Sequence, residues 1–232
     1  MDSQKVNRVI LPGDVLGEVT EKVKLRFGPG IRRGGDEIIA TKSGILRHRR
    51  PVTYWIDNNQ RRYVPVVDEF VIGVVTGKPS MDVYRVDIGG SMPASLSYLN
   101  FEGATKRNRP AVQVGDTIYG QLIVASKDME PEMTCVSVAG KANGMGVLEG
   151  GLMFQCSLGL SRKLLVTNSP ILAAFGKRFR FEITVGTNGR VWVKSPSIGQ
   201  TIALCNSLDA ASQMTMEQIE AMLSKLEKAA HN

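Results

Sequence analysis

The sequence predicts a multidomain protein in which two all-β modules are followed by one α+β unit. Three observations favour this class. A chain of 232 residues is long enough to hold two or three small hydrophobic cores. Up to about residue 140, short apolar runs alternate with turn signals, and no helical period of useful length is present. After that point the chain carries helix-capping patterns and an amphipathic helical segment.

Residues 1–65 are expected to form a small N-terminal β domain. The tripeptide 12–14 (PGD) makes a turn into the first strand, and 28–35 is expected to be a loop because glycine and proline interrupt it. A hairpin is expected around 57–60, where polar residues separate two short β-prone runs. The expected strands are 15–23, 37–46, 54–56 and 61–64.

Residues 66–140 are expected to form a second β domain. The expected strands are 70–75, 83–88, 117–125 and 133–138. Four or five short strands over about 70 residues fit a small closed barrel of the OB-fold type. A long loop is expected at 98–110, where Pro110 follows a basic cluster and disfavours helix.

Residues 141–232 are expected to form an α+β domain after a glycine-rich linker at 141–151. The tetrad 186–189 (GTNG) joins two alternating runs, which indicates a β-hairpin. Ser197 and Thr215 each begin an S/T-x-x-Q capping box. The expected elements are a strand at 152–158, helices at 161–166 and 170–175, a hairpin over 179–194 and a last helix with Ile219, Met222, Leu223 and Leu226 on one face. The order β-α-α-β-β-α matches a type I KH domain with an extra C-terminal helix.

The net charge of +7 is unevenly distributed along the chain. Residues 1–67 carry 13 Lys and Arg against 7 Asp and Glu. Residues 68–140 carry 6 against 9, and residues 141–232 carry 10 against 6. Particular basic surfaces on otherwise mixed domains fit a nucleic-acid partner.

Composition also argues against several classes of protein. No apolar run approaches the roughly 20 residues of a membrane span, so we expect no membrane partner, and the N-terminus lacks a signal-peptide pattern. With 3 cysteines widely spaced and 2 histidines, we expect no metal site and no cofactor, and we expect buried free thiols in a reducing, intracellular compartment. No paired carboxylates, nucleophile motif or P-loop is recognisable, so we do not expect an enzyme.

Seven motifs occur in order along nearly the whole chain: PGD at 12–14, FVIGV at 70–74, LSY at 96–98, NRP at 108–110, QVGD at 113–116, GMG at 144–146 and VGTNGRVWVK at 185–194. Together with the order of the three domains, they resemble the RNA-binding cap subunits of the exosome. Those subunits carry an N-terminal domain, an S1 domain and a KH domain. Within that family the chain is most similar to the subfamily called the ribosomal RNA-processing protein 40 type.

The resemblance implies a non-catalytic subunit that binds RNA and guides it into a ring of RNase PH-like subunits for 3'-5' processing and decay. It also implies that the subunit stabilises this ring. The implied partners are single-stranded RNA, the ring subunits and other cap subunits, and the implied location is the nucleus and nucleolus, and also the cytoplasm. The alternatives are a freestanding S1/KH RNA-binding regulator and an RNA-processing enzyme.

A short basic cluster in the loop at 98–110 is the candidate RNA-binding site. Lys106, Arg107 and Arg109 are candidates for phosphate contacts, and Asn108 is a neutral hydrogen-bond donor among them. The alternative is a solvated loop without a ligand. Tyr98 is a candidate for stacking on a base, although aromatic residues here must also fill the barrel core.

The GTNG tetrad has the GxxG form with which KH domains hold a nucleic-acid backbone. In a type I KH domain that loop joins two helices, whereas here it joins two strands, and the segment 166–170 between the helices contains no glycine. We therefore interpret the tetrad as structural, with Asn188 and Gly189 providing a tight turn. The resemblance places Gly186 and Trp192 in the same structural signature.

Two features of the N-terminal domain have both a functional and a structural interpretation. The basic segments 47–50 and 61–62 are candidates to face RNA or an acidic subunit, and the alternative is a strand edge protected by charge. Pro12, Gly13 and Asp14 form a turn, and the resemblance implies that this turn contacts the ring.

Overall fold

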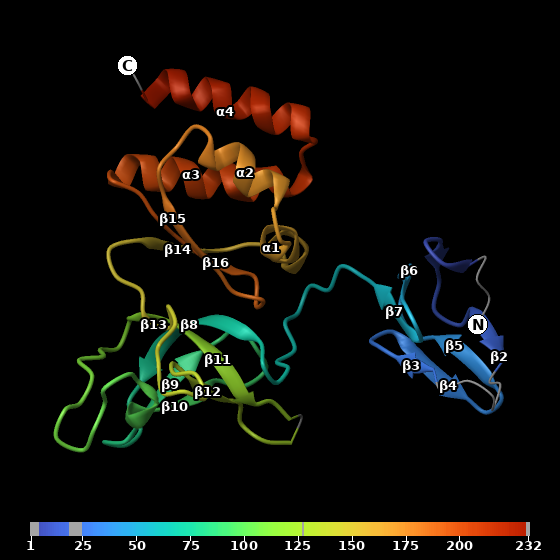
Figure 1. The fold of residues 1–232 in the computed structure, drawn as a ribbon, viewed down its shortest axis with the longest axis horizontal. Helices are drawn as coiled ribbons and strands as arrows, with labels where there is room; N and C mark the ends of the chain where they lie inside the picture. The colour runs from blue at the N-terminus through green and yellow to red at the C-terminus, as the bar shows by residue number, and fades with distance from the viewer. Residues whose placement is uncertain (1–4, 19–24, 127, 231–232) are drawn as a thin grey trace. The chain divides into compact units, whose positions relative to one another are not determined.

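The computed structural model describes residues 5–18, 25–126 and 128–230. The chain divides into two compact units, Met1–Gln60 and Arg61–Asn232 (Figure 1). The second unit holds both the barrel and the helical part of the chain.

The first unit consists of two small sheets. One has the strand order β1-β6-β7-β3, formed by Val9–Ile10 (β1), Gly44–Arg49 (β6), Thr53–Asp57 (β7) and Arg26–Phe27 (β3). The other has the order β2-β5-β4, formed by Val15–Glu18 (β2), Glu37–Ala40 (β5) and Ile31–Gly34 (β4). Leu16 and Ile38 from the second sheet pack with Leu46 and Ile56 from the first, and these four side chains are almost completely buried.

The structure corrects several strand predictions for this unit. The predicted strand 37–46 is two strands, because the chain breaks after Ala40 and the two halves join different sheets. The predicted loop 28–35 contains β4, which pairs with β5. The predicted strand 15–23 is present as β2, and its last residues lie outside the described part of the chain.

The predicted hairpin at 57–60 is also wrong. β7 pairs with β6 and β3, and residues 61–64 lie in no strand. Tyr63 explains the difference, because its ring packs into the core of the second unit, where it is 7% exposed.

The barrel of the second unit is a closed sheet. Its strands are Phe70–Gly77 (β8), Val83–Asp87 (β9), Ala94–Ser97 (β10), Thr117–Val124 (β11), Glu132–Thr134 (β12) and the accessory Gly146–Val147 (β13). Their order is β12-β10-β9-β8-β11-β13, and the additional β11–β12 pairing closes the barrel. This confirms the OB-type fold. β10 and β13 were not expected from the sequence, and β13 shows that part of the segment 141–151 belongs to the barrel instead of a linker.

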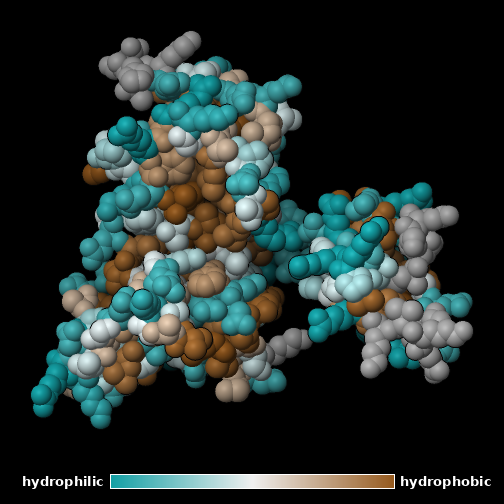
Figure 2. Space-filling view, in the orientation of Figure 1, coloured by the Kyte–Doolittle hydropathy of each residue, from teal (hydrophilic) through white to brown (hydrophobic). Residues whose placement is uncertain are grey.

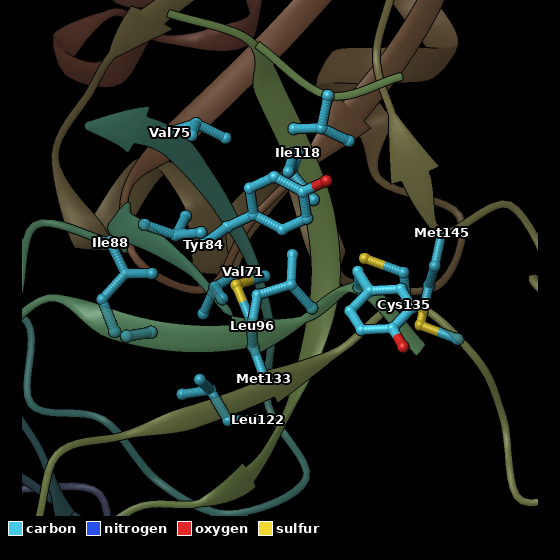
Figure 3. Packing of buried hydrophobic residues seen from close by; sticks show 14 of the residues in the cluster. Val71, Val75, Tyr84, Ile88, Leu96, Ile118, Leu122, Met133, Cys135 and Met145 are labelled. Carbon is cyan, nitrogen blue, oxygen red and sulfur yellow. The ribbon is translucent and has the colours of Figure 1, made fainter. Parts of the chain in front are cut away.

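Alternating residues of these strands point into the barrel and fill it. Tyr84, Leu96, Ile118, Leu122 and Met133 are each 2% exposed or less and pack together in its centre (Figure 3). Because side chains of a strand alternate between two faces, the buried residues of β9 and β11 alternate with more exposed ones.

The α+β part contains a three-stranded sheet covered by helices. Its elements are Leu152–Gln155 (β14), Leu158–Leu165 (α1), Pro170–Gly176 (α2), Glu182–Val185 (β15), Arg190–Lys194 (β16), Ile198–Ala210 (α3), the short 3-10 helix Ala211–Gln213 (η3) and Met216–Ala230 (α4). The sheet order is β14-β16-β15. In Figure 1, α2 and α3 lie between the sheet and α4. The predicted KH order with an extra C-terminal helix is confirmed.

The two capping boxes differ in detail. At α4, the Gln218 backbone N–H donates to Thr215 Oγ1 at 3.5 Å and the Thr215 N–H donates to Gln218 Oε1 at 3.0 Å, so the box is complete. At α3, Ser197 Oγ accepts from the Gln200 N–H at 3.2 Å. Gln200 Oε1 instead accepts from the Ser195 hydroxyl at 2.8 Å, so this box is half formed.

The two ends of the barrel have different surroundings. Because β9 and β11 both run antiparallel to β8, the start of β8 lies beside the ends of β9 and β11. The turn between β15 and β16 contacts this end. The other end carries the connections 78–82, 98–110 and 113–116, and it is the end where a ligand has access to loops.

Candidate nucleic-acid interface

The loop 98–110 begins with a short 3-10 helix, Tyr98–Asn100 (η2), that is fixed to the barrel. The Tyr98 N–H donates to the Asp82 carbonyl at 3.2 Å, which joins this loop to the β8–β9 connection. Asn100 Nδ2 donates to the Met133 carbonyl at 3.3 Å, and the Asn100 carbonyl accepts from the Cys135 N–H at 2.9 Å. The base of the loop is therefore held by three hydrogen bonds to two neighbouring segments.

The tip of the loop is closed by Asn108. Its N–H donates to Thr105 Oγ1 at 3.0 Å, its carbonyl accepts from the Thr105 N–H at 2.9 Å, and its side-chain Nδ2 donates to the Gly103 carbonyl at 3.2 Å. Lys106 and Arg107 are the two residues enclosed by this turn, and both are exposed. Neither has an ion-pair or hydrogen-bond partner among the described residues, so both charges are available to a ligand.

Arg109 and Tyr98 are engaged with each other. The guanidinium carbon of Arg109 lies 4.5 Å from the centroid of the Tyr98 ring, and Tyr98 is 5% exposed. Arg109 Nη1 also donates to the Met81 carbonyl at 2.7 Å, and Nη2 pairs with Asp82 Oδ1 at 3.3 Å. A base could reach the ring of Tyr98 only if Arg109 moved. This pair ties the loop 98–110 to the β8–β9 connection.

Lys78 is a further basic residue at this end that the sequence reasoning did not single out. Its Nζ lies 4.8 Å from the centroid of the Tyr84 ring, and the Tyr84 hydroxyl donates to the Pro110 carbonyl at 3.3 Å. Its position in the sequence could have indicated this role, because Lys78 follows directly after the end of β8 and therefore lies at the loop end of the barrel. Figure 2 shows hydrophilic side chains projecting at the lower left, where Figure 1 places these connections.

The acidic side chains at this end all accept hydrogen bonds or ion pairs from other residues of the chain. Asp82 pairs with Arg109, the Asp116 carboxylate accepts from the Gln113 N–H at 2.8 Å, and Glu102 accepts from the Ala142 N–H at 2.9 Å. Of the three carboxylates only that of Asp82 pairs with a basic side chain of the described residues, and that side chain is Arg109, so Lys106 and Arg107 keep their charges unpaired.

The GTNG tetrad lies at the opposite end, where it joins the α+β part to the barrel. The buried Asn188 Nδ2 donates to the carbonyls of Ile72 at 2.7 Å and Ile88 at 2.8 Å, and its Oδ1 accepts from the Ile72 N–H at 3.3 Å. The Thr187 N–H donates to the Phe70 carbonyl at 2.9 Å. The side-chain amide of Asn188 thus bridges the backbone of β8 at Ile72 and the backbone of Ile88, one residue after β9.

Both glycines of the tetrad lie where a side chain would collide with the backbone. A Cβ on Gly186 would lie 2.3 Å from Asn188 Oδ1 and 2.8 Å from the Ile72 nitrogen. Gly189 has a φ of +74°, and its Cβ would lie 2.8 Å from the Cys156 carbonyl oxygen. Position 186 therefore requires glycine because no side chain fits there. Position 189 requires glycine both for lack of space and because its φ is positive.

Arg190 adds an ion pair to the same contact. Its Nη2 lies 2.5 Å from Asp87 Oδ2, Nη1 donates to the Asp87 carbonyl, and the Arg190 side chain is 10% exposed. Burial alone would raise the pKa of the Asp87 carboxyl, but the hydrogen bond from Arg190, the Gly89 N–H and the attraction of the guanidinium together lower that pKa below its ordinary value of 3.8. The contact is thus strongest when Asp87 is ionised.

Trp192 lies within the α+β part, away from the candidate RNA-binding loop. It is 5% exposed on β16, and its neighbour on β14 is Met153. A Cβ on Gly151 would lie 2.4 Å from Trp192 Cε2, so this glycine leaves room for the indole.

Pro12, Gly13 and Asp14 form the turn between β1 and β2. Asp14 Oδ2 accepts from the Leu11 N–H at 2.9 Å, the Asp14 N–H donates to the Leu11 carbonyl at 3.1 Å, and Gly13 has a φ of +94°.

The barrel repeats this turn at 113–116. There Asp116 accepts from the Gln113 N–H, its own N–H donates to the Gln113 carbonyl at 3.2 Å, and Gly115 has a φ of +101°. Two motifs that look alike in sequence therefore form the same turn in separate units.

The chemistry of the remaining reactive groups is limited. Burial raises the pKa of the Cys135 thiol to about 12. Burial, and then the nearby Asp209 charge, raise that of Cys156 to about 11. Among the residues that the structure describes, no group of three or more His, Cys, Asp or Glu side chains could hold a metal ion, and no helix is long and apolar enough to cross a membrane.

Three family models match successive parts of the chain. Residues 8–59 match the N-terminal region of mammalian exosome complex component RRP40, residues 63–146 match the S1 domain of exosome complex component RRP40, and residues 151–199 match a KH domain.

Curated relatives match most of the chain. The human protein named exosome complex component RRP40 is 54% identical, with 88% of this chain and 77% of the human chain covered. The Drosophila melanogaster protein of the same name is 44% identical, with coverage of 94% and 95%. The Saccharomyces cerevisiae protein of that name is 37% identical, with coverage of 84% of each chain.

A solved structure supports the fold alone. The crystal structure, named for an exosome complex RNA-binding protein, superposes with a TM-score of 0.59 at 20% identity and covers 74% of this chain and 99% of its own.

Replacing Asn188 should weaken the joint between the barrel and the α+β part. Asn188→Ala leaves the backbone groups of Ile72 and Ile88 without these partners, so we expect a loss of about 2 to 4 kcal/mol in the free energy of unfolding. Thr187→Val is the matched control. It removes the hydrogen bond from Thr187 Oγ1 to the Phe70 carbonyl but keeps the bond from the Thr187 N–H, so it should cost about 1 kcal/mol. Urea denaturation of both variants measures the difference, and equal costs would contradict the role assigned to Asn188.

The Asp87–Arg190 pair should give a distinct pH dependence. Because the pKa of Asp87 is lower in the folded chain than its ordinary value of 3.8, its contribution is fully present above pH 3.8 and is lost as the pH falls through the folded pKa. Asp87→Asn should therefore lower stability at neutral pH by about 1 kcal/mol, since solvent screens this half-exposed carboxyl. The gap between wild type and variant in thermal melting should close below pH 3.8. A gap that is constant with pH would exclude this ionisation as its cause.

Proposed function

This chain belongs to the RRP40 family of exosome components, and from this membership we propose that it is a non-catalytic RNA-binding cap subunit of the exosome. In this role it binds single-stranded RNA and guides it into a ring of RNase PH-like subunits, which it also stabilises, for 3'-5' processing and decay. The nucleus and nucleolus, and also the cytoplasm, are its proposed locations.

The observation that carries the RNA-binding part of the proposal is the pair of free cations at the tip of a fixed loop. Lys106 and Arg107 are exposed, while Asn108 and Arg109 hold the loop that presents them. Each phosphate contact of a basic side chain releases counterions, so binding of this kind is strong at low salt and depends little on base sequence. We propose Lys106 and Arg107 as direct contacts and Asn108 and Arg109 as the residues that position them.

Tyr98 has a positioning role in this proposal. The centroid of its ring lies 4.5 Å from the guanidinium carbon of Arg109, and this contact helps to hold the loop in one conformation. Base stacking by Tyr98 would require Arg109 to leave both the ring and Asp82. Binding through the RNA backbone needs no such rearrangement.

The proposal of a non-catalytic role draws on the thiols. The pKa of Cys135 is raised to about 12 and that of Cys156 to about 11, so both are protonated at neutral pH and are poor nucleophiles. We propose that the nuclease activity belongs to other members of the assembly.

The turn at Pro12, Gly13 and Asp14 is the proposed contact with the ring. Val9 and Leu11, which flank it, are 74% and 58% exposed. Apolar side chains beside a rigid turn suit burial against another subunit, because their burial gains hydrophobic free energy with little loss of conformational entropy.

Removing the two free cations should weaken RNA binding and its salt dependence. For Lys106→Ala/Arg107→Ala we expect at least a tenfold loss of affinity for single-stranded RNA at low salt. The slope of log K against log salt should fall by about 1.4, since each single-strand phosphate contact contributes about 0.7. Fluorescence anisotropy at several salt concentrations measures both quantities.

Lys177→Ala/Lys225→Ala is the charge-matched control for that experiment. Both lysines are exposed on the helical part of the chain, so the same change in net charge is made far along the sequence from the loop. Equal losses in the two double variants would indicate a general charge effect and would contradict the loop as the binding site.

The assembly part of the proposal predicts a large native mass. A freestanding regulator would migrate in cell extract near its own 25.3 kDa, whereas a cap subunit should co-migrate with a far larger complex. Gel filtration of extract followed by immunodetection distinguishes the two. Pro12→Ala/Leu11→Ser should shift part of the protein to the low-mass fraction if the turn contacts the ring.

A further inference from the structure

The part of one sheet face that β6, β7 and β3 form in the first unit has no role in the proposed function. In the β6–β7 pair, Leu46 lies opposite Ile56, and both point into the core with exposures of 0% and 2%. Because neighbouring residues on a strand point to opposite faces, Arg47 and Trp55 point away from the core. We call this side the outer face and define it by Arg26, Arg47, Arg49, Thr53 and Trp55.

The register places three arginines around one tryptophan. Thr53 lies between Arg49 of β6 and Arg26 of β3, and Trp55, in the next row, lies beside Arg47. With a strand spacing of about 4.8 Å, the backbones of Arg26 and Arg49 are about 10 Å apart. The outer face thus carries one aromatic side chain, Trp55, with Arg47 beside it and with Arg49 and Arg26 in the neighbouring row.

The flank of Trp55 towards β3 carries no side chain. Gly28 lies against it, and a Cβ on Gly28 would lie only 2.8 Å from the Cβ of Trp55. Trp55 is half-buried, so part of the indole is accessible.

The charge of this face is only partly used within the protein. Arg47 Nη1 donates to Asn7 Oδ1 at 2.9 Å, and its Nε lies 3.9 Å from Asp57 Oδ2, so Arg47 is held in place. Arg26 and Arg49 are exposed and have no acidic partner among the described residues. The face therefore keeps two available guanidinium groups.

We propose that the outer face is a second binding surface for single-stranded RNA. RRM domains also bind RNA on a four-stranded sheet, through aromatic side chains that stack on bases. The indole stacks on one base, and Arg26 and Arg49, from the neighbouring row, contact the phosphates next to that base. Arginine suits this role because its guanidinium is weakly hydrated and bonds phosphate through two N–H groups.

This inference rests on the proposed function in taking single-stranded RNA as the ligand, but it concerns a different surface. The loop with Lys106 and Arg107 belongs to the second unit, and the outer face belongs to the first. The loop binds through charge alone, whereas the outer face adds stacking.

The first test compares two double variants of the full chain. Arg26→Gln/Arg49→Gln should bind a labelled oligouridine of about 20 nucleotides about tenfold more weakly at low salt, with a salt slope smaller by about 1.4. Arg32→Gln/Arg33→Gln is the matched control, because these arginines are exposed on β4 in the other sheet of the same unit. We expect the control to bind almost as wild type does. Equal losses in both variants, or no loss in the first, would overturn the proposal.

The second test reads stacking directly from tryptophan fluorescence. Of the two tryptophans, Trp192 is 5% exposed, so quenching by added oligouridine should come from Trp55. Trp55→Phe, which keeps an aromatic ring and should fold, should abolish the quenching. Quenching that persists in this variant would overturn the stacking role.

Parallel measurements separate this inference from the proposed function. If Lys106→Ala/Arg107→Ala loses affinity while Arg26→Gln/Arg49→Gln does not, the outer face is not an RNA surface and the loop still is. If Arg26→Gln/Arg49→Gln binds RNA as wild type does but fails to enter the large complex, the face serves a protein partner and the proposal is wrong. Loss in both, with additive effects when they are combined, supports two surfaces.

Discussion

The architecture of the second unit depends on one side chain, Asn188. Its amide supplies two donors and one acceptor to the backbones of Ile72 on β8 and Ile88 after β9, and all three are satisfied within a buried contact. Aspartate could not supply the donors, and glutamine would need one more methylene of space where Gly186 already lies against Asn188 Oδ1. Because a buried polar group without a partner costs free energy, the barrel and the α+β part can pack stably only in the orientation that satisfies this amide. The barrel and the α+β part therefore form one compact unit.

That contact also determines which end of the barrel stays open. Since the β15–β16 turn covers the start of β8, the free end is the one with the connections 78–82 and 98–110. There, internal contacts of Tyr98 and Arg109 fix the loop before any ligand arrives. A loop that is ordered in advance loses less conformational entropy on binding, so more of the electrostatic attraction of its free cations contributes to affinity.

The sequence predicted regular elements well and long-range contacts poorly. Strands β8, β9 and β11 are apolar-rich runs of five to eight residues between turn signals, so the sequence predicted them. Strands such as β4, β10 and β13 have two to four residues, and over that length a pattern cannot be distinguished from a loop. In the candidate site, the basic cluster was visible, but the pairing of Arg109 with Asp82 spans 27 positions and appears only in three dimensions.

The GTNG tetrad shows why a motif has to be judged by its location. In a KH domain the GxxG loop exposes its backbone so that a phosphate can approach it closely. Here the space beside the Gly186 backbone is filled by Asn188 Oδ1 and the Ile72 nitrogen, at 2.3 and 2.8 Å from where a Cβ would stand. A phosphate at this position would have to displace a hydrogen bond between two buried groups. The absence of side chains at Gly186 and Gly189 thus serves close packing of the protein against itself, and the cationic loop at the other end of the barrel is better placed to meet RNA.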